Sequence, residues 1–215
     1  MKRRKSDLLI NLFLLLVVCA LYAATSGDDL GNRLARMTMA PVYRGAGDAT
    51  ALLCRLDYDA AALEDILATL AARQTRITFA VSADWAAEHP KTLAELASTH
   101  ELAVMGNTRK EAAACKKAIE AAGGAPLYYY APPQKSAGRI AKKLGLTHVH
   151  GTADVLCAKG TAQDIAARAS NAAAKGSILL TQPTRAFADA LPALLSELQT
   201  KGLRVAAVGD AMHVT

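Results

Sequence analysis

From residue 49 onward, the chain alternates between short apolar runs and longer segments with helical periodicity, and this alternation restricts the possible folds most. Short apolar runs bounded by turn residues are typical of buried strands. Such runs occupy residues 51–56, 76–81, 101–105, 127–130, 147–150, 177–181 and 204–208. Strands that alternate with helices at this spacing form a parallel sheet.

The intervening segments predict helices at residues 60–73, 91–99, 110–122, 137–144, 162–174 and 185–201. Several end at glycine, which favours helix C-termini. About seven strand–helix units predict a distorted (β/α)7-type barrel, smaller than the eightfold form. Functional side chains of such a barrel lie at the C-terminal ends of its strands. These ends are residues 57–59, 105–109, 130–134, 151–154 and 182–184.

The composition favours a folded domain and argues against nucleic-acid binding. The chain has 215 residues, of which 52% are hydrophobic, which argues against disorder. Its net charge of +6 is concentrated at the N-terminus, where residues 2–5 hold four of the 25 basic residues. No basic stripe interleaved with aromatic residues occurs elsewhere, so we expect no nucleic-acid partner.

An apolar segment at residues 8–24 follows the basic N-terminus and predicts a membrane anchor. We expect residues 1–26 to be a cytoplasmic basic tip plus a transmembrane signal anchor, residues 27–48 a linker, and residues 49–215 a domain outside the cytoplasm. The alternative is a cleaved leader and a secreted protein, because Ala24-Thr25-Ser26 is a run of small residues.

Three of the four cysteines, Cys54, Cys115 and Cys157, lie in the predicted domain, and no CxxC pair is present. A structural zinc site is therefore not expected. One disulfide is possible outside the cytoplasm, but the spacing selects no pair, and buried free thiols are the simpler expectation.

Several segments, in order and with the right spacing, resemble the polysaccharide deacetylase family, the NodB homology domains of carbohydrate esterase family 4. The chain is most similar to its sporulation-associated, membrane-anchored branch, as a divergent member. The resemblance covers roughly residues 40–212. The segments that carry it are residues 76–81, 85–90, 100–102, 124–133 and 176–184.

This resemblance implies a metal-dependent hydrolase that removes N-acetyl groups from polysaccharides. In active members one aspartate and two histidines hold zinc or another divalent metal. The metal lowers the pKa of a bound water and polarises the acetyl carbonyl. An aspartate accepts the proton from that water, and a late histidine protonates the leaving amine.

Matching the motifs residue by residue shows which of these groups the chain retains. Asp57 matches the aspartate ligand. The base is replaced by Arg55, the two histidine ligands by Met105 and Arg109, and the late histidine by Gln182. A guanidinium has no lone pair for a metal, and Asp57 alone cannot build a three-ligand zinc site. The resemblance therefore implies a degenerate site, no expected cofactor and a pseudoenzyme.

Other residues are candidates for binding or for a rebuilt site. Binding candidates at the strand ends are Asp57, Tyr58, Tyr130, Asp154 and Gln182. His148 and His150 are two residues apart on a predicted strand, so we expect both to face the same side, where they could hold a metal with Asp57 or Asp154. The simpler expectation is that they pack in the barrel.

We also expect Trp85 to pack in the core and His100 to be structural. Arg55, Asp57 and Arg109 are expected either to form an ion pair in place of the metal or to be solvated surface charges.

Three functions are consistent with these residues and with the resemblance. The first is a membrane-tethered, non-catalytic protein that binds cell-wall glycan or a protein partner, in a sporulation context that the resemblance implies. The second is an active hydrolase of carbon–nitrogen bonds with a rebuilt site that includes zinc or another divalent metal. The third is a structural partner in a membrane complex.

Overall fold

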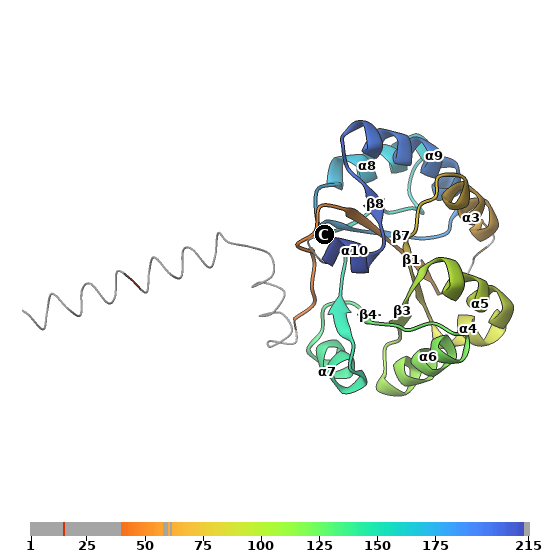
Figure 1. The fold of residues 1–215 in the computed structure, drawn as a ribbon, viewed down its shortest axis with the longest axis vertical. Helices are drawn as coiled ribbons and strands as arrows, with labels where there is room; N and C mark the ends of the chain where they lie inside the picture. The colour runs from red at the N-terminus through yellow and green to blue at the C-terminus, as the bar shows by residue number, and fades with distance from the viewer. Residues whose placement is uncertain (1–14, 16–39, 58–59, 61, 213–215) are drawn as a thin grey trace, which may run out of the picture.

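The computed structural model describes residues 15, 40–57, 60 and 62–212. Apart from Leu15, these residues form a curled parallel sheet surrounded by helices (Figure 1). The strands run in the order β5-β4-β3-β2-β1-β7-β6, and β8 pairs with β1 beside this path. Their bounds are β1 Thr50–Leu56, β2 Thr78–Val81, β3 Glu101–Met105, β4 Tyr128–Tyr130, β5 Thr147–Val149, β6 Ala153–Asp154, β7 Ile178–Thr181 and β8 Val205–Ala206.

Helices cover the outer face of the sheet, and a last short helix lies inside its curve. The outer helices are α3 Leu63–Ala72, α4 Ala83–Glu88, α5 Pro90–Thr99, α6 Arg109–Ala121, α7 Lys135–Leu144, α8 Ala162–Ala172 and α9 Arg185–Thr200. The inner helix is α10 Val208–Met212, next to β1 and β8 in Figure 1. The predicted parallel α/β architecture is therefore present, as an open half-barrel rather than a closed one.

Side-chain alternation along each strand divides the core into two layers. From β1, Leu52, Cys54 and Leu56 face the outer helices, whereas Ala51 and Leu53 face the inside of the curve. The inner layer contains many small side chains, and the apolar face of α10 packs against them. The half-barrel is thus filled from within by the chain's own C-terminal helix.

The run at residues 204–208 is not one strand, because Val205–Ala206 alone pairs with β1 and Val208 begins α10. Polar groups hold this helix start in place. The Val208 amide donates to Thr78 Oγ1 at 2.7 Å, and the Gly209 amide lies 3.2 Å from both oxygens of Glu101. The Thr78 hydroxyl donates to Glu101 Oε1 at 2.6 Å.

Residues 40–48, the end of the predicted linker, pack against the domain. Val42 is buried and bridges Val149, with its amide donating to the His148 carbonyl at 2.9 Å. Gly45 lies so close to α10 that an added Cβ would be 1.8 Å from the Ala211 carbonyl oxygen. The folded unit therefore begins before residue 49. The rest of the linker and the predicted anchor, apart from Leu15, lie outside the described residues.

The helices that the structure describes include none that is long and apolar enough to cross a membrane. The three cysteines of the described domain are buried free thiols. Burial raises the pKa of both Cys115 and Cys157 to about 11.

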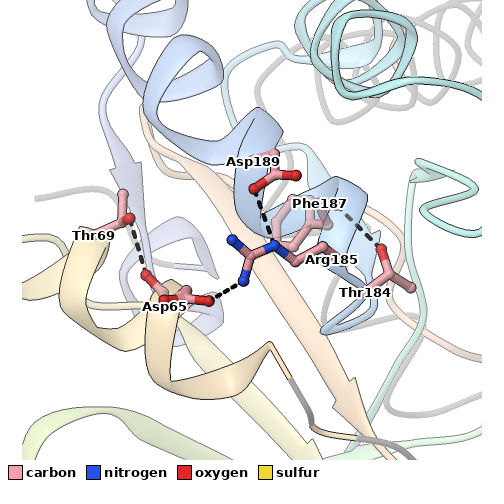
Figure 2. Close-up of polar contacts among 6 residues, drawn as sticks. All are labelled: Asp65, Thr69, Thr184, Arg185, Phe187 and Asp189. Carbon is pink, nitrogen blue, oxygen red and sulfur yellow. Dashed lines mark hydrogen bonds and ion pairs between the residues drawn. The ribbon is translucent and has the colours of Figure 1, made fainter.

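The seam between α3 and α9 carries an exposed polar cluster (Figure 2). Arg185, in the first turn of α9, forms ion pairs with Asp65 of α3 and with Asp189 one turn further along α9. The Thr184 side chain caps α9 by accepting from the Phe187 amide at 3.1 Å. The Arg185 side chain is 71% exposed, so its ion pairs contribute little beyond orienting the two helices.

Glu101→Ala should weaken the attachment of α10, because it leaves the Gly209 amide and the Thr78 hydroxyl without their acceptor. We expect a loss of about 2 kcal/mol in the free energy of unfolding, measured by urea denaturation. Glu88→Ala, at an exposed position, should change it by less than about 0.5 kcal/mol. Equal effects of the two substitutions would contradict this role of Glu101.

His100 is buried, as expected of a structural histidine, with its Nδ1 3.4 Å from the Ile77 amide. Burial, reinforced by the positive charge of Arg76, lowers its pKa from 6.5 to about 4. Between these values the unfolded chain binds the proton and the folded chain does not, so folding stability falls as the pH decreases.

In the wild type this contribution should approach about 1.4 kcal/mol per pH unit below pH 6.5. His100→Gln should remove it, which makes the pH profile of urea unfolding shallower between these limits. Parallel profiles for the wild type and the variant would contradict this assignment.

Candidate functional site

A pocket of about 250 Å³ lies at the C-terminal end of the half-barrel, where the sequence predicts function. The ends of β1, β3 and β4 and the first turns of α4 and α6 form its wall. Its lining residues are Arg55, Asp57, Ser82, Ala83, Asp84, Met105, Gly106, Asn107, Glu111, Tyr130, Ala131 and Pro132.

Arg55 is the central cation of this pocket and lies on the inward-facing side of β1. Its Nη1 donates to the Tyr130 hydroxyl at 3.2 Å, and its guanidinium carbon is 5.9 Å from the Tyr130 ring centroid. Its Nε is buried without a hydrogen-bond partner among the described residues. Burial alone would lower the pKa of Arg55, but Tyr130, Asp154 and Asp57 together hold it above its ordinary value. The pocket therefore contains a permanent positive charge.

The loop between β3 and α6 forms the opposite wall and is held by Glu111. One carboxylate oxygen of Glu111 accepts from the Asn107 amide at 2.9 Å, and the other from the Thr108 hydroxyl at 3.0 Å. These hydrogen bonds lower the pKa of Glu111. The Tyr129 hydroxyl donates to the Gly106 carbonyl at 2.5 Å. Burial raises the pKa of Tyr129 to about 12.

An aromatic stack connects the pocket to the surface. The His150 ring stacks on Tyr130 with centroids 5.6 Å apart, and the Tyr43 ring also lies 5.6 Å from His150. Tyr43 is 45% exposed. Tyr43 and His150 therefore extend an aromatic surface outward from the pocket, next to Arg55.

The structure brings four of the predicted site residues together, namely Arg55, Asp57, Met105 and Tyr130. Arg109 is exposed as the first residue of α6 and does not line the pocket. Within the described part of the chain, no ion pair joins Asp57 to Arg109 or to Arg55, so the predicted ionic cluster is absent there. The cluster does not form because α6 begins at Arg109, so the Arg109 side chain is exposed outside the pocket wall.

Asp154 and Gln182 are not part of the described pocket wall. Asp154 is exposed, and its carboxylate accepts from the Leu156 amide at 2.8 Å in a turn. Gln182 contacts the loop after β6 through its backbone amide, 3.4 Å from Cys157 Sγ. Tyr58 lies outside the described residues.

The prediction that His148 and His150 face the same side is wrong. His148 is buried against Tyr129 in the outer layer and lies 3.1 Å from the Ala131 carbonyl, whereas His150 stacks on Tyr130. The reason is that β5 ends at Val149, so strand alternation does not extend to position 150. Trp85 is buried in the core, as predicted.

The donor set of this pocket does not fit the zinc site that the resemblance implies. Across residues 40–57, 60 and 62–212, no group of three or more His, Cys, Asp or Glu side chains is placed to hold a metal ion. Of the pocket carboxylates, Glu111 already accepts hydrogen bonds with both oxygens. Met105 and Arg55 bring an apolar side chain and a cation instead of ligands.

Three further polar residues that line the pocket were not expected from the sequence, namely Ser82, Asp84 and Glu111, whereas Asn107 lies in the predicted strand end at 105–109. The sequence does contain a pattern that could have identified Glu111. Thr108 and Glu111 have the Thr-x-x-Glu spacing of a capping box, which predicts a helix start and a carboxylate beside it. Ser82 likewise caps α4 by accepting from the Trp85 amide at 3.2 Å.

Comparison with known proteins identifies the fold through structure alone. No protein-family model matches the chain. No curated protein matches it either. A CE4 family pseudoenzyme from Bacillus anthracis is similar in structure, with a TM-score of 0.76, 20% identity, and coverage of 81% of this chain and 69% of that chain.

Two further solved structures have the same fold. A peptidoglycan N-acetylglucosamine deacetylase has a TM-score of 0.71 and 19% identity, with coverage of 80% of this chain and 92% of that chain. PdaA of Bacillus subtilis, a family 4 carbohydrate esterase, has a TM-score of 0.73 and 17% identity, with coverage of 86% and 89%. The chain therefore has the fold of CE4 polysaccharide deacetylases.

Proposed function

We propose that this protein is a non-catalytic member of the polysaccharide deacetylase family, tethered to the membrane by its N-terminal segment, that binds cell-wall glycan outside the cytoplasm. The binding site is the pocket at the C-terminal ends of the strands, extended by Tyr130 and His150. A protein of the membrane or cell wall is the alternative partner. The sporulation context stays a hypothesis that rests on the resemblance alone.

The observation that carries the proposal is the position of Arg55. Its guanidinium lies in the pocket beside Asp57, the residue that matches the family's aspartate ligand. A permanent cation repels a divalent metal and offers it no lone pair. In a partly desolvated pocket this repulsion is on the order of several kcal/mol, enough to cancel the attraction of one carboxylate at a similar distance.

The lining of the pocket suits a sugar. Its hydrogen-bonding groups include the Asn107 side chain, the Ser82 hydroxyl and the Asp57 carboxylate, and Tyr130 offers an aromatic ring. A few polar groups beside an aromatic surface are the usual means of orienting a small polar ligand. Its volume of about 250 Å³ limits the pocket to a single sugar unit or its substituent, while the rest of a chain would lie across the Tyr43 and His150 surface.

The solved structures supply independent support. One similar structure is a pseudoenzyme, and a mutant of that protein is described as having restored enzymatic activity. That mutant has a TM-score of 0.75 and 20% identity to this chain. A pseudoenzyme with this fold has therefore regained activity by mutation, which motivates the first experiment.

Combining Arg55→Asp with Met105→His should create a three-ligand zinc site with Asp57, because all three positions line the pocket. After dialysis, elemental analysis should find about one zinc per chain in the variant and none above the buffer blank in the wild type.

A histidine placed away from the pocket provides the control. Lys91→His adds the same number of imidazoles at an exposed position and should retain no zinc. Stoichiometric zinc in the wild type would overturn the proposal and favour the active hydrolase.

Tyr130→Ala should weaken binding to glycan, because it removes the aromatic wall of the pocket and the partner of Arg55. The full-length protein in detergent should co-sediment with insoluble peptidoglycan, and Tyr130→Ala should reduce the bound fraction at least threefold. Leu127→Ala, which removes an exposed apolar side chain away from the pocket, should not.

The other two functions predict different outcomes in the same assay. Release of acetate from the glycan by the wild type would identify an enzyme. No co-sedimentation of the wild type would overturn glycan binding and favour a structural partner of a membrane complex.

A further inference from the structure

A second and larger cavity, of about 560 Å³, lies at the other end of the half-barrel, where the strands begin. The loops that lead from α3 into β2 and from α9 into β8 form it. Three arginines line it, Arg73, Arg76 and Arg204, whereas Asp210 is the one acidic residue in its described lining. The rest of the chain beyond the N-terminal basic cluster is close to charge balance, so this concentration of arginine is unusual for the protein.

We propose that this cavity binds a phosphate monoester or diester of a small polyol or sugar. Planar guanidinium groups form paired hydrogen bonds with phosphate oxygens, and three of them converge here from two segments far apart in the sequence. The site is distinct from the proposed glycan pocket and does not depend on it.

The contacts of the arginines leave donors free for a ligand. Arg73 Nη2 donates to Ser196 Oγ at 3.0 Å, which orients that side chain across the α3–α9 seam. Arg204 Nη2 lies 3.5 Å from Asp48, a long and half-exposed ion pair. Arg76 forms no hydrogen bond or ion pair with the residues that the structure describes, so its five N–H groups are available.

A simpler role for these arginines would be to neutralise the C-terminal ends of α3 and α9. The terminal carbonyls, however, already accept hydrogen bonds from the backbone. The Thr75 amide donates to the Leu70 carbonyl at 2.9 Å, and the Leu203 amide to the Leu198 carbonyl at 2.9 Å. Capping by arginine side chains is therefore not required at either helix.

The remaining lining determines which anion fits. Gln74, Thr75 and Gln199 offer side chains that hydrogen-bond hydroxyl groups, and Leu195 and Leu203 form an apolar wall. Bare inorganic phosphate would leave most of this space to water. A phosphate ester with a hydroxylated body uses both parts of the cavity, whose volume lies in the usual range for small-molecule sites.

Arg76 also connects the cavity to His100, because its charge is one of the two causes of the low pKa of that histidine. An anion bound to Arg76 would offset this charge and raise the pKa of His100. By linkage, the protonated form of His100 should favour binding of the anion relative to the neutral form. The imidazole resonance of His100 provides a local readout that general surface binding would not change.

The test is a calorimetric titration of the full-length protein in detergent at low salt with glycerol 3-phosphate, inorganic phosphate and glycerol. We expect saturable millimolar or tighter binding of glycerol 3-phosphate, weaker binding of inorganic phosphate, and none of glycerol. Arg76→Gln should weaken the ester at least about fivefold, and Arg73→Gln and Arg204→Gln should also weaken it.

Arg139→Gln is the matched control, since it removes one exposed charge on α7 and should leave the affinity unchanged. Nuclear magnetic resonance should show that the ligand raises the pKa of His100 in the wild type but not in Arg76→Gln. An equal loss of affinity in Arg139→Gln, equal affinity for inorganic phosphate, or no saturation at millimolar concentration would overturn the proposal.

Discussion

The central strand β1 hydrogen-bonds to β2, β7 and β8, and the positions of both ends of the half-barrel depend on these ladders. Its register is set by burial on both faces, because a shift by one residue would move Arg55 into the apolar outer layer and Cys54 into the pocket. Such a shift would bury a cation without a partner at a cost of several kcal/mol. The position of the Arg55 guanidinium in the pocket is therefore a consequence of sheet packing rather than of local loop structure.

A fixed cation in this place changes what the pocket can bind. A metal site gathers anionic and neutral donors around a cation, whereas here the cation is part of the protein and the ligand must bring the complementary groups. Tyr130 supports Arg55 through its hydroxyl and its ring, which orients the guanidinium without neutralising it. Hydroxyl and carbonyl oxygens of a glycan are suitable partners for such a group.

The sequence predicted the strands and the end of the sheet that carries the pocket, because hydrophobic alternation and burial follow from local pattern. The prediction of 101–105 coincides with β3, and Met105 reaches the pocket as expected. The failures occur where regular structure stops. His150 follows the last residue of β5, and Arg109 begins a helix, so neither side chain obeys the spacing that was used to place it.

Long-range contacts explain the other differences from the predicted fold. Val208 continues an apolar run whose pattern predicts a strand. Its amide, however, donates to the Thr78 hydroxyl and the Gly209 amide donates to Glu101, so the chain begins α10 at this point. Both acceptors lie more than a hundred residues away in the sequence, so no local sequence pattern predicts these hydrogen bonds. The half-barrel also depends on Val42, which forms a bridge to Val149 of β5 although the two residues lie far apart in the sequence.

The inner helix separates the two cavities and limits how they can influence each other. Val208, Ala211 and Met212 fill the inside of the curve, while Asp210 of the same helix lines the arginine-rich cavity. The two ends are connected by the strands of the sheet and by the attachment of α10 to Glu101 and Thr78. Because that attachment consists of short hydrogen bonds to two neighbouring strands, it favours a rigid connection, and the two ends are best regarded as separate binding sites on one scaffold.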